Sequence, residues 1–530
     1  MRREVVPGLL EDAGQSSRRQ YEHPVNTGTP GILLVLDGWG HAEPSDANAL
    51  AAASTPYLDS LLANCPTALA DASGTAVGLL PGTVGNSEIG HMVIGAGRPI
   101  AYDSVLVQEE ISTGRMRTNR ELVEVLTRLA ATGGALHLIG LSSDGMIHAD
   151  VRHLQELLCI AAQFSVPRVR IHAITDGRDV ANDTAATYLG LVDTFTEEAG
   201  IGEVVTVVGR GYALDKSGDL ELTEKVALAV VEGKGEAISE PREALALTQR
   251  GDEWVPPCVV TGADGRALGM VEDGDAVLFT NFRSDRIQQL ADDLHRRLAG
   301  RQITFLSLAQ YDTRAPIPPL VHRSDAGGGL AEQLAAHGVR SVRVAETEKF
   351  EHVTYYLNGR NASPVPVEEH VKITGHAAPD YQARPEMNID QVTEAVVAAA
   401  RRDDVPLVVA NLANIDVVGH TGHFDATRQA AEHTDRAVEA ICRSARATGR
   451  WVLLVGDHGN AEKMLTEGAD EAPRPYGGHT SNPVPAVLVP APGQDTLKPA
   501  GSVTLADIAP SVLSLLGLAV APRMTGRALW

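Results

Sequence analysis

The sequence has few cysteines, few aromatic residues and no long hydrophobic run. Its four cysteines are scattered without C-x-x-C spacing, which argues against a disulfide framework or a zinc knuckle and suits a reducing cytoplasm. Aromatic residues make up only 4% of the chain, so its cores must be built from Ala, Val, Leu and Ile. No apolar stretch approaches the length of a membrane-spanning helix, and we expect no membrane partner.

The chain also has fewer basic than acidic residues. The chain has 45 Lys and Arg against 68 Asp and Glu, a formal net charge of −23, which disfavours nucleic acid and anionic membranes as partners. An anionic substrate would therefore need a locally basic pocket. Residues 1–26 are polar and lack the apolar segment of a secretory signal, so we expect a flexible extension there.

What the sequence does have is a series of short apolar runs with the length of buried strands. Residues 32–36, 407–411 and 451–455 come from opposite ends of the chain, and each leads into an aspartate. Continuous apolar runs of this length are typical of parallel strands covered on both faces. The aspartates would then lie beyond the carboxyl ends of strands, where α/β proteins gather ligand groups. Taken singly, each aspartate could equally be a helix N-cap.

The middle of the chain carries a second set of such runs, at residues 136–141, 169–174, 204–208 and 276–280, with helical patterns such as 151–163 between them. A chain of 530 residues is too long for one compact core. The predicted fold class is therefore α/β, with two doubly wound α/β domains, one inserted in the other. We expect residues 27–103 and 324–530 to form the outer domain and residues 104–323 the inserted one.

Ser87 lies in the segment Gly-Asn-Ser-Glu-Ile-Gly-His at residues 85–91. Flanking glycines let the backbone turn sharply and let a bulky anion approach. A serine hydroxyl is a poor nucleophile at neutral pH unless a base or a metal lowers its pKa. By itself the motif is equally compatible with a capping serine in a glycine-rich turn.

Other residues supply a pattern typical of metal ligands. Asp416 and His420 are four apart, on one face if helical, and Asp457 and His458 follow an apolar run. Oxygen and imidazole ligands without thiolate favour Mn²⁺ or Zn²⁺. Two such ions close together can hold a phosphoryl group between nucleophile and leaving oxygen. The candidate ligands are Asp37, Ser87, Asp416, His420, Asp457, His458 and His479.

Six motifs in this order and spacing resemble the cofactor-independent phosphoglycerate mutases of the alkaline-phosphatase-like superfamily. They lie at residues 85–91, 175–179, 281–286, 345–349, 418–422 and 457–462. The resemblance implies a metal domain that carries an inserted glycerate-binding domain. It implies an isomerase of glycolysis and gluconeogenesis that interconverts 3- and 2-phosphoglycerate through a phosphoserine, without 2,3-bisphosphoglycerate. It also implies two Mn²⁺ ions, with Zn²⁺, Co²⁺ or Mg²⁺ as substitutes, in a cytoplasmic monomer.

The resemblance also implies residue roles. Ser87 would be the nucleophile, Lys349 would steady the phosphoryl group, and Asp179 would move the proton of the glycerate hydroxyl, with Arg283 also in the catalytic set. One ion would be held by Asp37, Ser87, Asp457 and His458, and the other by Asp416, His420 and His479. The phosphorylated glycerate would be bound by His148, Arg178, Asp179, Arg210, Lys216, Arg283, Arg286 and Lys349.

Some positions depart from the family pattern on the substrate side. Gly211 and Lys216 stand where the family usually has Tyr and Arg, and a lysine cannot form the two-pronged contact of a guanidinium. Ordinary drift explains this, but so does a paralogue that transfers a phosphoryl or phosphonyl group to another acceptor. A plain metallophosphatase is disfavoured by the arginines of the inserted segment. A non-catalytic binding protein is disfavoured because no candidate ligand is missing.

Overall fold

A computed structural model describes residues 28–215, 218–375, 380–466, 473–494, 499 and 501–530. The extension predicted at residues 1–26 and the candidate Lys216 lie outside the described residues. The chain divides into two compact units. Unit 1 comprises the residues up to Val77 together with Gly82–Pro99 and Ala326–Trp530, and unit 2 comprises Gly78–Pro81 and Ile100–Asp325.

Unit 1 is built on an eight-stranded sheet within the described residues. Its strands, in spatial order, are β12 (Glu368–Ile373), β11 (Ser341–Glu346), β13 (Leu407–Leu412), β1 (Gly31–Leu36), β14 (Trp451–Gly456), β15 (Val484–Val489), β2 (Thr67–Asp71) and β16 (Val503–Thr504). The five strands from β12 to β14 are parallel, whereas β15 runs antiparallel to both its neighbours. The apolar runs predicted as strands at 32–36, 407–411 and 451–455 are β1, β13 and β14, buried at every residue.

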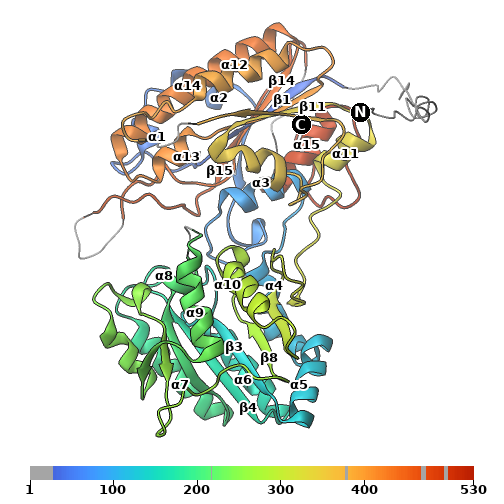
Figure 1. Cartoon of the computed structure of the whole chain (residues 1–530). Helices are drawn as coiled ribbons and strands as arrows, with labels where there is room; N and C mark the ends of the chain where they lie inside the picture. Colours follow the sequence, from blue (N-terminus) through green and yellow to red (C-terminus); the bar gives the residue numbers. More distant parts are fainter. Residues whose placement is uncertain (1–27, 216–217, 376–379, 467–472, 495–498, 500) are drawn as a thin grey trace, which may run out of the picture. The chain divides into compact units, whose positions relative to one another are not determined.

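Helices cover both faces of this sheet, with α12 and α14 on one face and α3 and α15 on the other (Figure 1). The first face packs apolar residues of α12, α14 and α2 against alternate residues of β11, β13, β1 and β14. The helices of unit 1 are α1 (Ala49–Ala52), α2 (Pro56–Asn64), α3 (Ser87–Ala96), α11 (Leu330–Ala336), α12 (Ile389–Ala400), α13 (Asn414–Gly419), α14 (Phe424–Ala447) and α15 (Ile508–Leu515). Short turns of helix lie at η1 (Gly74–Ala76), η5 (Thr347–Lys349), η6 (His352–Tyr356) and η7 (Leu505–Asp507).

Unit 2 is built on its own eight-stranded sheet within the described residues. In spatial order the strands are β10 (Pro319–Val321), β9 (Thr304–Ala309), β8 (Ala276–Phe279), β3 (Ala135–Leu141), β4 (Arg168–Thr175), β5 (Glu203–Gly209), β7 (Cys258–Val260) and β6 (Glu236–Ile238). All neighbours are parallel except β5 and β7. The four runs predicted as strands in the middle of the chain are β3, β4, β5 and β8.

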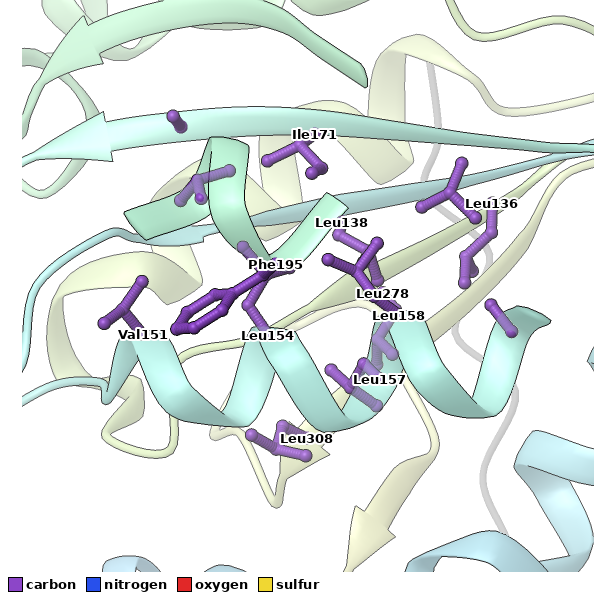
Figure 2. Close-up of a cluster of buried hydrophobic side chains, with 14 of the residues drawn as sticks. Leu136, Leu138, Val151, Leu154, Leu157, Leu158, Ile171, Phe195, Leu278 and Leu308 are labelled. Carbon is purple, nitrogen blue, oxygen red and sulfur yellow. The ribbon is translucent and has the colours of Figure 1, made fainter. Parts of the chain in front are cut away.

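The predicted helix at 151–163 is α6 (Val151–Gln163), whose leucines pack against the sheet of unit 2 (Figure 2). Burial of this apolar face is what fixes the helix, since full burial of one leucine stabilises by about 1.5–3 kcal/mol. The remaining helices are α4 (Asp103–Ser112), α5 (Arg120–Thr132), α7 (Ala185–Ala199), α8 (Arg210–Ala213), α9 (Leu220–Glu232) and α10 (Ser284–Arg297), with short turns η2 (Arg115–Thr118), η3 (Pro241–Leu247) and η4 (Asp252–Trp254). The α/β prediction with two doubly wound sheets is confirmed. Among the described helices, none combines the length and apolar character needed to span a membrane.

Candidate active site

The strand register of unit 1 brings three candidate ligands to one edge of its sheet. Leu36 is level with Leu412 on one neighbouring strand and with Gly456 on the other, so β13, β1 and β14 end together. Asp37 and Asp457 directly follow β1 and β14, and Asp416 lies in α13 just beyond β13. All three aspartates are buried, at 0–1% exposure. A buried carboxylate is stable only when it is paired or bound to a cation.

Ser87 reaches the same place as the first residue of α3. Asn86 is the N-cap, and its side chain accepts a hydrogen bond from the Ile89 backbone, so the capping role belongs to Asn86 and leaves the serine hydroxyl free for chemistry. Ser87 Oγ lies 2.9 Å from His458 Nε2 and 3.3 Å from Asp37 Oδ1. Lys349, at the end of η5, donates to the same Oγ at 2.7 Å.

In the described part of the chain, two groups of three side chains have ligand atoms within 4.8 Å of one another. One group is Asp37, Asp457 and His458, and the other is Asp416, His458 and His479. His420 completes the second neighbourhood, because its Nε2 lies 3.4 Å from Asp416 Oδ1 and 3.1 Å from His479 Nε2. The structure thus gathers every candidate metal ligand named from the sequence.

The donor set suits divalent cations. Among the described residues, none hydrogen-bonds the buried oxygens Asp416 Oδ1 and Asp457 Oδ2. An unpaired buried carboxylate oxygen is costly, and a coordinated cation satisfies it. The second ring nitrogens are held by carbonyl oxygens, His420 Nδ1 by Gly477 and His479 Nδ1 by Gly85. Such bonds leave both Nε2 atoms as ligands, as in many metal sites.

Lys349 and His458 carry positive charge that offsets two of the three carboxylate charges. Burial opposes charge on Lys349, but Asp37 at 2.7 Å and Asp416 at 2.6 Å raise the pKa of its ammonium. Burial likewise opposes charge on His458, yet Asp457, Asp37 and Asp416 raise its pKa to about 9. A cation bound here would therefore displace a proton from His458, because a metal-binding imidazole must be neutral.

Sequence reasoning missed two buried neighbours of this site, His91 and Asn411. His91 is in the Gly-Asn-Ser-Glu-Ile-Gly-His segment, one helical turn after Ser87, and Asn411 is in β13. Both are 0% exposed. A polar residue within the otherwise apolar run 407–412 was the signal that could have identified Asn411.

Unit 2 has its own polar pocket, at the carboxyl ends of β4 and β5. Its lining includes the candidates His148, Arg178, Asp179, Arg210 and Arg286. Arg283 contacts Asp285 at 2.9 Å, and Arg286 contacts the same carboxylate at 3.3 Å. The pocket lining has three guanidinium groups, those of Arg178, Arg210 and Arg286, beside three carboxylates, those of Asp179, Asp215 and Glu253. The lining therefore offers guanidinium groups to an anion but has no formal excess of positive charge.

Burial and the arginines set the protonation of this pocket. Burial and the charges of Arg210 and Arg283 lower the pKa of His148 to about 3, so its imidazole is neutral at pH 7. Burial also raises the pKa of Asp179, although Arg210 opposes this. Asp179 is therefore a stronger base than an ordinary aspartate.

Asp176 organises the pocket and was missed as a functional residue. Its Oδ1 accepts from the backbone of Arg178 and Asp179 and from Arg210 at 2.7 Å, and its Oδ2 accepts from Ser143 at 2.5 Å. One buried carboxylate thus fixes both the loop after β4 and the guanidinium that follows β5. The sequence signal was the segment Thr-Asp-Gly-Arg-Asp at residues 175–179, which contains a second aspartate, Asp176, three residues before Asp179.

The departure at Gly211 is matched by a neighbouring tryptophan. A Cβ at Gly211 would lie 2.8 Å from the Glu253 carbonyl oxygen and 2.9 Å from the Trp254 ring. The ring of Trp254 also contacts Tyr212 edge-on, with centroids 5.8 Å apart. The glycine therefore leaves no gap, because Trp254 fills the pocket wall there.

Comparisons with known proteins agree with this geometry. The family model of the Metalloenzyme superfamily matches residues 29–520. A 2,3-bisphosphoglycerate-independent phosphoglycerate mutase of Streptomyces coelicolor is 60% identical over 511 residues, covering 96% of this chain and 99% of that protein. One from Synechococcus is 39% identical, covering 94% and 95%. A crystal structure of Leishmania mexicana phosphoglycerate mutase at low cobalt concentration is similar with a TM-score of 0.76 and 26% identity, covering 96% and 99%.

Proposed function

This chain belongs to the 2,3-bisphosphoglycerate-independent phosphoglycerate mutases, and on that premise we propose that it interconverts 3- and 2-phosphoglycerate through a phosphoserine at Ser87. The observation that carries the proposal is the environment of Ser87 Oγ, which lies within 3.3 Å of Asp37, His458 and Lys349. A serine hydroxyl among carboxylates, an imidazole and an ammonium is set for activation rather than for packing.

We propose that two Mn²⁺ ions are the resident cofactors. Asp37, Ser87, Asp457 and His458 would hold one, and Asp416, His420 and His479 the other. The unpaired oxygens of Asp416 and Asp457 support this assignment, as does the mixed oxygen and nitrogen donor set. When bound, these ions would lower the pKa of the Ser87 hydroxyl and offset charge on the phosphoryl oxygens.

The first half-reaction moves the phosphoryl group from substrate to Ser87. Ser87 would attack as its alkoxide, so that a bond forms between Oγ and phosphorus while the bond from phosphorus to the 3-oxygen breaks. That oxygen would take its proton from Asp179, which is then ready to act as the base in the second half-reaction. Lys349 offsets charge on the phosphoryl oxygens in the loose transition state of such transfers. Its three contacts, to Asp37, Ser87 and Asp416, support this role by fixing the ammonium beside Oγ.

The second half-reaction returns the phosphoryl group to the 2-hydroxyl. Asp179 would take the proton of that hydroxyl as its oxygen attacks phosphorus, and the bond to Ser87 breaks. The raised pKa of Asp179 supports its exchange of protons near neutral pH. The glycerate would be held by Arg178, Arg210, Arg283, Arg286 and neutral His148, and Lys216 is proposed for the same set from the sequence alone. Guanidinium groups suit this ligand because they bind carboxylates with two parallel hydrogen bonds.

The substrate, a phosphorylated glycerate, follows from the family. We further propose that the chain is a monomer and works in the cytoplasm. Light scattering of the purified protein tests the first point, since a dimer would double the 56.0 kDa mass of the chain. Fractionation of the cells that express the protein tests the second.

The direct test mixes Mn²⁺-loaded protein with 3-phosphoglycerate in the absence of 2,3-bisphosphoglycerate. Formation of 2-phosphoglycerate, followed through coupled enolase, is expected and should stop on chelation. Ser87→Ala should lower turnover by at least about 10³-fold, because the covalent route is lost, and mass spectrometry of quenched wild-type protein should find phosphate on Ser87. Retained turnover in Ser87→Ala would refute the nucleophile. Correct folding and Mn²⁺ binding without any isomerisation would refute the proposed reaction.

A further inference from the structure

Two fully buried side chains form a hydrogen-bonded chain from Ser87 to Asp37. His91 Nδ1 lies 2.8 Å from the carbonyl oxygen of Ser87, one turn earlier in α3. The other ring nitrogen, Nε2, is 3.1 Å from Asn411 Nδ2 in β13. That same Nδ2 is 2.7 Å from Asp37 Oδ2 at the end of β1. His91 and Asn411 thereby connect a helix and two strands behind the proposed metal ligands.

The donors and acceptors in this hydrogen-bonded chain allow only one arrangement of its protons. The carboxylate of Asp37 pairs with the Lys349 ammonium, so Asp37 can only accept. The amide of Asn411 must therefore turn its NH₂ group, not its oxygen, toward Asp37. The second hydrogen of this NH₂ group points to His91 Nε2, which must accept it. His91 is then neutral, with its proton on Nδ1, and it donates that proton to the Ser87 carbonyl.

This arrangement decides which oxygen of Asp37 faces the site. Because Asn411 occupies Oδ2, the oxygen turned toward Ser87 Oγ is Oδ1, at 3.3 Å. The N–H of His91 is also only 3.3 Å from Asp457 Oδ2. The chain thus contacts three of the four residues assigned to one ion, and it touches none of the atoms that would react.

We propose that His91 and Asn411 are positioning residues that hold Ser87 and Asp37 so that Oγ and Oδ1 face the same cation. This positioning role rests on the proposed function, because it is the proposed function that assigns Ser87 and Asp37 to the same ion. Partners of this kind behind metal ligands typically change affinity by about 10–100-fold when removed.

The experiment compares Mn²⁺ affinity, measured by titration calorimetry, across three His91 variants of the full chain. In His91→Gln the amide oxygen reaches the position of Nε2 and can accept from Asn411. The side-chain bond to the Ser87 carbonyl is lost, but that carbonyl stays within α3, so affinity should stay within about 3-fold of wild type. His91→Asn reaches only the position of Nδ1, and His91→Leu replaces neither nitrogen, so both should bind about 10–100-fold more weakly. His153→Leu, which removes a buried histidine of unit 2, is the matched control and should leave affinity unchanged.

Two further measurements keep the outcome clear. Nitrogen-15 NMR of the Mg²⁺-loaded protein should find the His91 proton on Nδ1, and a proton on Nε2 would overturn the inference. Equal affinities for the Gln and Asn variants would overturn it too, and this comparison holds even if the Leu variant does not fold.

Asp37→Asn distinguishes a failure of the proposed ligand set from a failure of the positioning role. If it leaves Mn²⁺ binding unchanged, the proposed ligand set fails. If it weakens binding while all His91 variants match wild type, only the positioning role fails.

Discussion

At the scale of single residues, the site is dominated by buried charge that must be balanced locally. The three carboxylates of Asp37, Asp416 and Asp457 are offset in part by Lys349 and His458, both of which have raised pKa values despite burial. Glu346 shows what burial does where no such balance exists. It ends β11 at 1% exposure, and its Oε2 accepts from Asn388 at 3.0 Å. Burial raises its pKa from 4.5 to about 7, with a smaller contribution from Glu348.

Glu346→Gln should therefore change how stability depends on pH. With a folded pKa above the unfolded value, native Glu346 holds its proton more tightly between pH 4.5 and about 7. Its contribution to stability is present below pH 4.5 and is lost as pH rises through 7. The variant should be more stable than wild type at pH 8, by up to about 3 kcal/mol, and equal to it near pH 4.5. Urea unfolding at both pH values measures this, and a pH-independent difference would contradict it.

At the scale of elements, function depends on the residues placed directly after each strand. In unit 1 the ends of β13, β1 and β14 are level and present carboxylates, while in unit 2 the ends of β4 and β5 present Asp176 and Arg210. Parallel strands make this arrangement possible because all their carboxyl ends lie at one edge. The short α8 begins at Arg210, so the guanidinium is fixed by both a strand end and the Asp176 carboxylate at 2.7 Å.

Asp176→Asn tests this fixing of the unit 2 pocket. The amide cannot balance the charge of Arg210. Its NH₂ group can replace only Oδ2, where the Ser143 hydroxyl must then accept a hydrogen bond instead of donating one. We expect KM for 3-phosphoglycerate to rise about 10-fold or more, while Mn²⁺ affinity stays unchanged because the proposed ligands belong to unit 1. Steady-state kinetics with calorimetry on the same preparation measures both. A loss of Mn²⁺ binding, or an unchanged KM, would contradict the role of Asp176.

At the scale of the whole molecule, chemistry is divided between two units that each have their own sheet and core. Every proposed metal ligand belongs to unit 1, and the arginines that would bind glycerate belong to unit 2. Metal binding should therefore stabilise one unit directly. Because the chain is strongly negative overall, an anionic substrate would depend on the guanidinium groups of the unit 2 pocket for local positive charge.

Scanning calorimetry can detect this division. Mn²⁺ at 100 times its Kd should add about 2.7 kcal/mol to the stability of the metal-binding unit. The shift should shrink in Asp37→Asn, which removes a proposed ligand of one of the two ions, and should persist unchanged in Asp176→Asn. It should also shrink from pH 8 to pH 6, because protons compete for His458, whose pKa without metal is about 9. An equal shift in both variants, or one independent of pH, would contradict the assignment of ligands.

The sequence by itself determined seven of the sixteen strands in the described residues and the residue types at their carboxyl ends. Buried parallel strands must be continuously apolar, and the turn after a strand is local, so runs such as 407–411 and motifs such as residues 85–91 were readable without a fold. Only the tertiary structure decided how Ser87, Asp37 and Asp457 meet. The register of β1 and β14, which are far apart in the sequence, brings the two aspartates together, and the placement of α3 adds Ser87. The same holds for the pairing of His91 with Asn411 and of Trp254 with Gly211. Such contacts are set by packing between elements, and the residues that make them have no regular spacing along the sequence.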